Sequence, residues 1–230
     1  MIKRLISLVT VLLFAGLFSL VILHWQPKDK LEGVAQQYVE QEARDLGAMN
    51  LVTAIVVSYR GLDTLGEVTV LFLAASGIAL LLRRDNKNKN RKTDQRPASE
   101  FVQTGVRLLV PLIVMFGVYI FLNGHLSPGG GFQGGAVIAS AMLLLFLADP
   151  AYQLKHRILD IIESLSGFAY VLTGLFGLFL TGSFLDSRIL PPGTFGTLLS
   201  AGTIPLIYTW IGLKVGTELA GILDNLKGYE

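Results

Sequence analysis

The chain has 230 residues, of which 52% are hydrophobic and only 16% are charged, and it contains no cysteine. A soluble domain normally carries about 25% charged residues, so this composition is typical of an integral membrane protein. Disulfides, thiol catalysis and cysteine-based metal sites are excluded, and the three histidines form no metal-ligand pattern. The net charge of +2 gives no indication of a nucleic-acid partner. We expect neither a metal nor a cofactor.

Six apolar runs are long enough to cross a hydrocarbon core, which takes roughly 20 residues of helix. The first run could be a cleaved signal peptide, but it is too long for one and no small-residue cleavage site follows it, so we expect a retained anchor. The sequence therefore predicts an all-α, polytopic membrane protein. Its six spans are predicted at residues 5–25, 64–82, 106–122, 128–147, 158–181 and 197–223.

Two segments between the first spans should not cross the membrane. Residues 27–49 are polar and mildly amphipathic, which favours a surface helix. The block 51–82 would be about 48 Å long as one helix, which exceeds a bilayer, and "YRGLDTLGE" interrupts it. Residues 52–59 are therefore predicted to be a short element ahead of the second span.

Prolines mark two of the later spans. Ser127 is a good N-cap and Pro128 is suited to the first helical position, which predicts that the fourth span begins there. Pro205 predicts a kink in the sixth span.

The basic residues are distributed unequally between the two sides of the predicted topology. Cytoplasmic loops of membrane proteins carry an excess of Lys and Arg. With the N-terminus inside, five basic residues fall outside and Lys214 falls within the membrane. The thirteen on the inner side are Lys3, Arg4, Arg83, Arg84, Lys87, Lys89, Arg91, Lys92, Arg96, Arg107, Lys155, Arg157 and Lys227. Both termini are predicted to be cytoplasmic. The basic loop 83–100 is a solvated connector or a site for anionic headgroups.

The stretch "NGHLSPGGGFQGG", residues 123–135, joins the third and fourth spans on the outer side. Gly130 with Gly134, and Gly131 with Gly135, have the spacing of small residues in packed membrane helices. No strand precedes the glycines, so a nucleotide-binding loop is excluded. His125 has two open interpretations: it caps a helix end, or it transfers protons because its ordinary pKa lies near neutrality.

Ionisable residues within membrane spans are functional candidates by default, because they are costly in hydrocarbon. Lys214 and Glu218 lie four residues apart on one face of the sixth span. Counted from residue 223, Lys214 is about 14 Å deep. This pair either locks the helix against a partner protein or forms a protonatable site beside an ion path.

Acidic residues near the starts of two other spans are weaker candidates. Arg60, Asp63 and Glu67 have helical spacing and could form a local ion-pair network, and Glu67 in the first turn suits the helix dipole or takes part in ion transfer. Asp160 and Glu163, at the start of the fifth span, are best explained by the same dipole.

At these residues the chain resembles a known family. "GHLSPGGGFQGG", with "LLVPLIVMFGVYIFLNGH" before it and "IPLIYTWIGLKVGTELAGIL" near the end, resembles the MnhB-type (or MrpB-type) component of Mrp multisubunit sodium/proton antiporters over residues 101–230. "VTAIVVSYRGLDTLGEVTVLFLAASGIALLL" resembles MbhE, a small membrane component of membrane-bound hydrogenases, which corresponds to the C-terminal part of the large MrpA-type antiporter component. The usual antiporter carries these two elements on separate chains.

The resemblance implies three regions: 1–82 like the MrpA-type C-terminus and MbhE, the linker 83–100, and a four-helix domain 101–230. It implies an accessory membrane component of a Na⁺/H⁺ antiporter module in the inner (plasma) membrane, with partners of the A, C, D, E, F and G types and membrane lipids. The parent complex would be an Mrp antiporter or a redox-driven, hydrogenase-type complex whose ferredoxin-linked redox centres lie on other chains. The chain shows no catalytic constellation of its own. The alternative is a structural scaffold without ion-handling residues.

Overall fold

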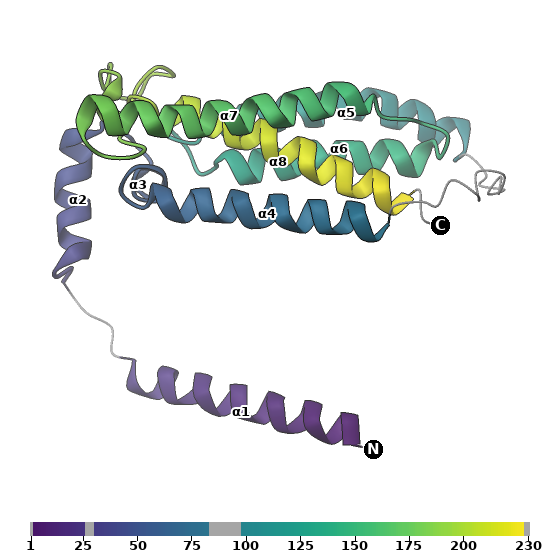
Figure 1. Ribbon diagram of the computed structural model, residues 1–230, viewed down its shortest axis with the longest axis horizontal. Helices are drawn as coiled ribbons and strands as arrows, with labels where there is room; N and C mark the ends of the chain where they lie inside the picture. Colours follow the sequence, from purple (N-terminus) through teal and green to yellow (C-terminus); the bar gives the residue numbers. More distant parts are fainter. Residues whose placement is uncertain (1, 26–29, 83–97, 228–230) are drawn as a thin grey trace. The chain divides into compact units, whose positions relative to one another are not determined.

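The computed structural model describes residues 2–25, 30–82 and 98–227 (Figure 1). These residues form helices and connecting turns, with no strand among them. The chain divides into two compact units, residues 1–37 and 38–230. Six helices of the described chain are long and apolar enough to cross a membrane, which confirms the predicted number of spans.

The first unit contains α1 (Ile2–His24), whose 23 residues make a rod of about 35 Å. None of the residues in the most apolar 18-residue segment of α1 is buried. A helix that is apolar on all sides is stable in lipid or against another membrane chain. The helix predicted for the first span is therefore present.

α2 (Val34–Asp45) crosses the boundary between the units and is shorter than the surface helix predicted at 27–49. Its limits follow from two glycines in the left-handed region, Gly33 with φ of 65° before it and Gly47 with φ of 63° after it. Left-handed backbone cannot continue a right-handed helix, so both positions stop it.

The second unit is a bundle of long helices with short elements at one end. The elements after α2 are α3 (Leu51–Ala54), the π-helical segment η1 (Ile55–Tyr59), α4 (Gly61–Leu81), α5 (Glu100–Leu122), α6 (Gly131–Ala148), α7 (His156–Thr181), the 3₁₀ turn η3 (Ser187–Ile189) and α8 (Ile204–Lys227). The short element predicted at 52–59 corresponds to α3 and η1. The predicted linker 83–100 lies mostly outside the described residues, which resume at Ala98.

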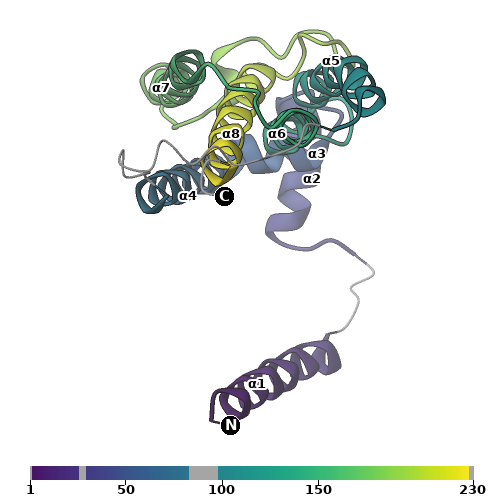
Figure 2. The ribbon, with the colours of Figure 1, turned by 90° about the vertical axis from the view of Figure 1, so that its right-hand side faces the viewer.

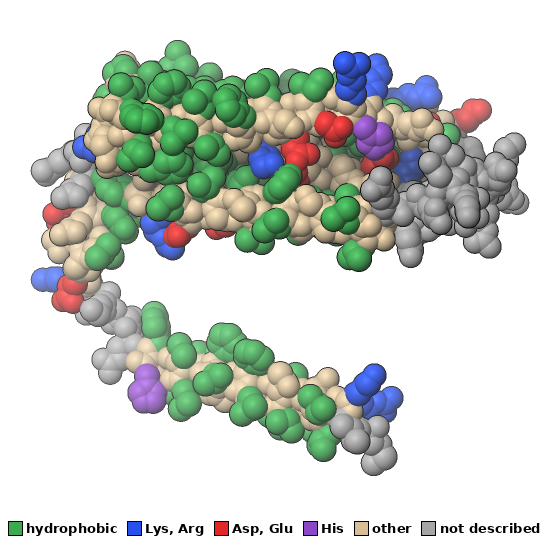
Figure 3. All heavy atoms as spheres, in the orientation of Figure 1, with side chains coloured by type: hydrophobic (Ala, Val, Ile, Leu, Met, Phe, Trp, Pro, Cys, Tyr) green, Lys and Arg blue, Asp and Glu red, His purple; other side chains and the backbone are tan. Residues whose placement is uncertain are grey.

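α8 lies in the middle of this bundle and contacts α4, α5, α6 and α7 (Figure 2). In the most apolar 18-residue segment of α8, 56% of the residues are buried, whereas 11% are buried in the corresponding segment of α4. The outer faces of the other helices carry exposed leucine, phenylalanine, valine and isoleucine side chains (Figure 3). A bundle with apolar groups outside and polar groups on its central helix has the organisation of a membrane protein.

The predicted start of the fourth span is wrong, because α6 begins at Gly131 and not at Pro128. The Ser127 hydroxyl does not cap α6. It donates a hydrogen bond to the backbone carbonyl of Asn123 at 3.2 Å, and the Ser127 backbone N–H donates to the same carbonyl at 2.9 Å. Ser127 therefore completes the turn that follows α5.

The predicted start of the sixth span is also wrong. Residues 197–203 form turns in which Ala201 and Gly202 have positive φ, so α8 begins at Ile204. Pro205 is then the second residue of the helix, where no backbone N–H is needed, and it does not kink the span. At the second span, α4 begins at Gly61, which places Asp63 in the first turn and Glu67 beyond it.

Candidate functional site

Lys214 is the centre of a charged cluster inside the bundle. Its Nζ donates a hydrogen bond to Oε1 of Glu218 at 2.5 Å, one helical turn along α8. The Glu218 side chain is completely buried and that of Lys214 is 11% exposed. The pair proposed from sequence spacing is thus brought together within the core of the bundle.

The structure adds a third charged residue to this pair. Oε1 of Glu163, on α7, lies 3.6 Å from Lys214 Nζ, within ion-pair distance. The sequence interpretation assigned Glu163 to the helix dipole at the start of α7. Its role beside Lys214 depends on the packing of α7 against α8, which no local pattern reveals. Glu163, Lys214 and Glu218 are called the charged triad below.

Neighbouring helices shape the space around the lysine. On α7, a Cβ placed at Gly167 would lie 3.3 Å from Lys214 Cδ, so the glycine leaves room for the lysine stem. On α4, the ring of Phe72 lies 4.9 Å from Lys214 Nζ, at cation–π distance. The ammonium group is therefore held from three helices.

A crevice with a volume of about 180 Å³ lies beside the triad, between α4, α7 and α8. Its lining includes Glu163 and Glu218 of the triad and the polar side chains of Ser76, Thr217 and Asn225. Figure 3 shows blue and red side chains set between the apolar faces of these helices. The crevice gives the two carboxylates a polar surrounding within an otherwise apolar part of the molecule.

A histidine–aspartate contact lies at the end of the same crevice. His156, at the start of α7, lines the crevice, and its Nε2 is 3.1 Å from Oδ2 of Asp224 on α8. The His156 side chain is 64% exposed, so this end is open in the described chain. Asp160, also on α7, lines the wall between His156 and Glu163.

The glycines of the loop and of α6 allow close helix contacts within this chain. A Cβ at Gly131 would lie 2.6 Å from Cβ of Ile211, and one at Gly135 would lie 2.8 Å from Cβ of Val215, both on α8. Gly134 faces the opposite way, where a Cβ would lie 2.6 Å from the Gly117 carbonyl oxygen of α5. α6 therefore packs against two helices at once.

Gly130 precedes α6 and packs against an aromatic side chain of α8. A Cβ at this position would lie 3.3 Å from Cζ of Tyr208.

His125 is completely buried in the loop between α5 and α6. Its Nε2 lies 3.3 Å from the Thr197 carbonyl oxygen, and its Nδ1 has no hydrogen-bond partner among the described residues. Burial lowers the pKa of His125 below its ordinary value of 6.5, which favours the neutral ring at neutral pH. His125 lies at the opposite end of α8 from the triad's crevice.

The residues around the start of α4 form only part of the network predicted for them. Arg60 Nε donates to Asp63 Oδ2 at 2.7 Å, and both side chains are exposed. Glu67 is also exposed, on a face of α4 that does not line the crevice. The structure therefore brings Arg60 and Asp63 together and leaves Glu67 facing outward.

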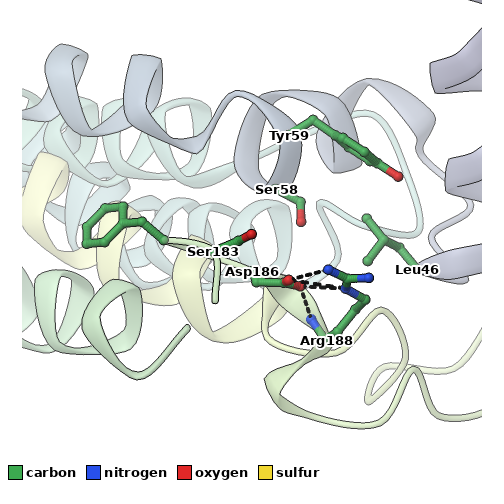
Figure 4. Close-up of a pocket in the computed structure, with 7 residues that line it drawn as sticks. Leu46, Ser58, Tyr59, Ser183, Asp186 and Arg188 are labelled. Carbon is green, nitrogen blue, oxygen red and sulfur yellow. Dashed lines mark hydrogen bonds and ion pairs between the residues drawn. The ribbon is translucent and has the colours of Figure 1, made fainter. Parts of the chain in front are cut away.

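A second polar cavity of about 370 Å³ lies near the other end of α4, α7 and α8 (Figure 4). Its labelled residues come from the chain before α3, from η1 and from the α7–α8 connection. Arg188 donates hydrogen bonds to both carboxylate oxygens of Asp186. Its Nη2 lies 2.6 Å from Oδ2, and its Nε lies 3.1 Å from Oδ2 and 3.0 Å from Oδ1. These hydrogen bonds lower the pKa of Asp186, so the pair stays ionised. Sequence reasoning missed this pair.

Comparison with known proteins gives two family matches along the chain. Residues 101–221 match the family described as a domain related to the MnhB subunit of Na⁺/H⁺ antiporters, and residues 3–101 match MbhE, the E component of MBH. The chain is 30% identical over 198 residues to an uncharacterised protein of Methanocaldococcus jannaschii, covering 75% of this chain and 74% of that protein.

Two solved structures are also similar. One chain of the membrane-bound sulfane sulfur reductase, an archaeal respiratory membrane complex, has 44% sequence identity and a TM-score of 0.83, with 98% of each chain covered. A chain of the Mrp complex from Dietzia sp. DQ12-45-1b shares the fold, with 24% identity and a TM-score of 0.78 over 99% of this chain and 26% of that one.

The chain therefore carries an MbhE match over residues 3–101 followed by an MnhB match over residues 101–221. The helices that carry the charged triad, α7 and α8, lie almost wholly within the MnhB match. This chain belongs to the family of membrane domains related to the MnhB subunit of Na⁺/H⁺ antiporters.

Proposed function

We propose that this chain is a membrane subunit of a monovalent cation/proton antiporter module within a redox-driven respiratory complex. The observation that carries the proposal is the 98% mutual coverage, at 44% identity, with a chain of an archaeal respiratory membrane complex. The redox centres lie on other chains, and this chain supplies membrane helices to the module. A stand-alone Mrp antiporter is the second candidate, favoured by the shared fold with a chain of the Dietzia Mrp complex.

Within the module, the chain has two tasks. It packs against the channel-forming subunits through its exposed apolar helices, and Glu67 on the outer face of α4 is a candidate contact with such a subunit. It also handles ions at the charged triad, in which two carboxylates lie within 4 Å of one buried ammonium group. A purely structural scaffold has no need for a buried lysine and a completely buried glutamate, because apolar residues stabilise a core at least as well.

The orientation that we propose places the crevice on the cytoplasmic side of the plasma membrane. Arg157 and Lys227 lie at the same end of the bundle as His156, while Arg188 lies near the opposite end. Seven basic residues of the sequence argument, between Arg83 and Arg96, lie outside the described residues. Lysine and arginine at one end of a helix bundle favour that end for the cytoplasm.

Co-purification tests the assembly. The full chain, carrying an affinity tag, is isolated from its own membranes in a mild detergent, and the recovered proteins are identified by mass spectrometry. We expect antiporter-type membrane subunits together with iron–sulfur redox subunits. Antiporter subunits without redox subunits would favour the stand-alone Mrp complex. Recovery of this chain alone, under conditions in which other membrane complexes stay intact, would contradict both candidates.

A further inference from the structure

We propose that the crevice between α4, α7 and α8 is a proton-access path that ends at Glu218, and that the charged triad holds one exchangeable proton. Only the biological purpose of this proton site rests on the proposed function, because the site itself lies within this chain.

The charge of the triad supports a single bound proton. Lys214 contributes one positive charge, and Glu163 and Glu218 contribute two negative charges when both are ionised. An uncompensated charge in a membrane interior is costly, and a buried ion pair is favourable only when its charges are balanced and hydrogen-bonded. One proton on either carboxylate makes the triad neutral.

The geometry identifies where that proton binds. Oε1 of Glu218 accepts the hydrogen bond from Lys214 at 2.5 Å, whereas Oε2 is buried and has no hydrogen-bond partner among the described residues. An ionised carboxylate oxygen in that position would be desolvated without compensation. Because Glu218 lines the crevice, its carboxylate can take a proton from a hydronium ion in the crevice, which leaves as water, and can return it by the reverse step.

Lys214 can respond to this proton by exchanging partners. Its Nζ lies 2.5 Å from Glu218 and 3.6 Å from Glu163, so a small rotation of its flexible stem exchanges the short and the long contact. When Glu218 is protonated, the ammonium group is attracted to the remaining carboxylate, Glu163. When Glu218 is ionised, the short contact seen in this structure forms.

The surroundings favour a proton over an alkali cation. The site beside both carboxylates is already taken by the Lys214 ammonium group, which is tethered to the chain and would compete with any Na⁺ or K⁺. The other titratable groups that line the crevice are His156 and Asp160 of α7, and Asp224 of α8 contacts His156 at its end. α4 contributes Phe72, Ser76 and alanines, α6 has no titratable residue, and Glu100 and Arg107 of α5 are exposed.

Infrared spectroscopy of the intact complex in liposomes tests the proton site. We expect a carboxylic-acid C=O band that grows as the pH falls, that is lost in Glu218→Gln, and that keeps its titration when Na⁺ is replaced by choline. Glu163→Gln is the second variant: it makes the triad neutral without a proton, so the band should move to lower pH. Glu100→Gln, an exposed carboxylate on α5, is the matched control and should leave the band unchanged.

Because the chain contains no cysteine, single cysteines introduced by mutation test the access path separately. Ala79→Cys places a thiol in the crevice lining, whereas Leu80→Cys places one on α4 outside it. A cationic, membrane-impermeant thiol reagent should slow the infrared-detected proton exchange in the first variant and not in the second.

Three outcomes would overturn the proposal: a band that survives Glu218→Gln, a titration that shifts with Na⁺ (which would indicate a metal-cation site), or equal effects of the two cysteine variants. The band is read on this chain's own carboxyl groups whichever proteins co-purify with it. Failure here is therefore distinct from failure of the proposed assembly.

Discussion

The side-chain amide of Asn50 donates hydrogen bonds to the backbone carbonyls of Gly124 at 2.9 Å and Ser127 at 3.0 Å. Asn50 lies in the MbhE match and both acceptors lie in the MnhB match. The Thr53 hydroxyl adds a third bond, to Gly124 at 2.7 Å. The loop with the long glycine motif is thus fixed by residues of the other region.

Asn50→Ala should therefore weaken the contact between the two regions. The Ser127 carbonyl loses its side-chain donor, and an unsatisfied buried group costs about 1–3 kcal/mol. The Gly124 carbonyl loses one of two donors and keeps the hydrogen bond from the Thr53 hydroxyl. Thermal unfolding of the purified full-length protein in detergent should show a lowered midpoint. Asn123→Ala is the control, since that amide donates to the Tyr119 carbonyl of its own exposed turn at 3.1 Å. Equal effects of the two substitutions would contradict the role given to Asn50.

The close packing of α6 on α8 predicts opposite results for two glycine substitutions. Gly135→Ala forces a methyl group against Val215 and the Gly212 carbonyl oxygen, and overpacking of this kind costs about 1–3 kcal/mol. Gly105→Ala meets nothing within 4 Å and should stabilise α5 by about 0.5–1 kcal/mol. Unfolding midpoints in detergent and recovery of the complex by pull-down measure both effects. An unchanged midpoint for Gly135→Ala would exclude the close contact.

The burial of His125 predicts that the folded protein loses stability in mild acid. Its pKa is lowered by burial in the folded protein, while the unfolded chain has the ordinary value of about 6.5. Below that pH the unfolded state binds a proton that the folded state does not, so the free energy of unfolding falls as the pH drops from 6.5 toward the lowered pKa. Above 6.5 the effect is absent. The unfolding midpoint of His125→Gln should depend less on pH across this range than that of the unmodified protein. The same pH dependence in both proteins would contradict a lowered pKa of His125.

The charged triad predicts that two substitutions together are tolerated better than one. Lys214→Met leaves two carboxylates without a counter-charge, and breaking a buried pair in this way costs about 3–5 kcal/mol. Lys214→Met with Glu218→Gln leaves only Glu163, which is 27% exposed to the crevice. The double variant should recover assembly of the complex, measured by pull-down, but not proton flux, measured in inverted vesicles. Normal flux in the double variant would favour the scaffold alternative.

Cysteine labelling tests the proposed orientation. Ala151→Cys lies in the exposed connection between α6 and α7, and Phe195→Cys lies in the exposed connection between α7 and α8. A membrane-impermeant reagent added to intact cells should label the second position and not the first. Labelling of both from the same side would contradict the arrangement of the helices across the membrane, and the reversed pattern would invert the orientation.

The sequence predicted those parts of the fold and site that depend on local spacing. Apolar runs gave the number of spans, and the four-residue separation of Lys214 and Glu218 gave their contact. Glu163 could not be found in this way, because its distance from Lys214 is set by the packing of α7 on α8. The same limit applies to the glycines: their spacing predicted close packing, but not that Gly134 faces α5 while Gly131 and Gly135 face α8.

The predicted starts of α6 and α8 were wrong for a different reason. Ser127 has the residue type of an N-cap, but its hydroxyl and backbone N–H are both used by the Asn123 carbonyl, and its own carbonyl is used by Asn50. At α8, the turns before Ile204 depend on backbone torsions at Ala201 and Gly202 that an apolar pattern does not encode. Competing hydrogen bonds and turns within connecting segments moved both starts toward the C-terminus.

The central position of α8 has a consequence for biosynthesis. α4, α5, α6 and α7 all precede it in the chain and all contact it, so they enter the membrane before the helix that joins them exists. Until α8 emerges, Gly131 and Gly135 of α6 and Glu163 of α7 lack the contacts that they make with α8. Glu163 therefore gains the counter-charge of Lys214 only after α8 has been synthesised, although Glu163 itself lies earlier in the chain.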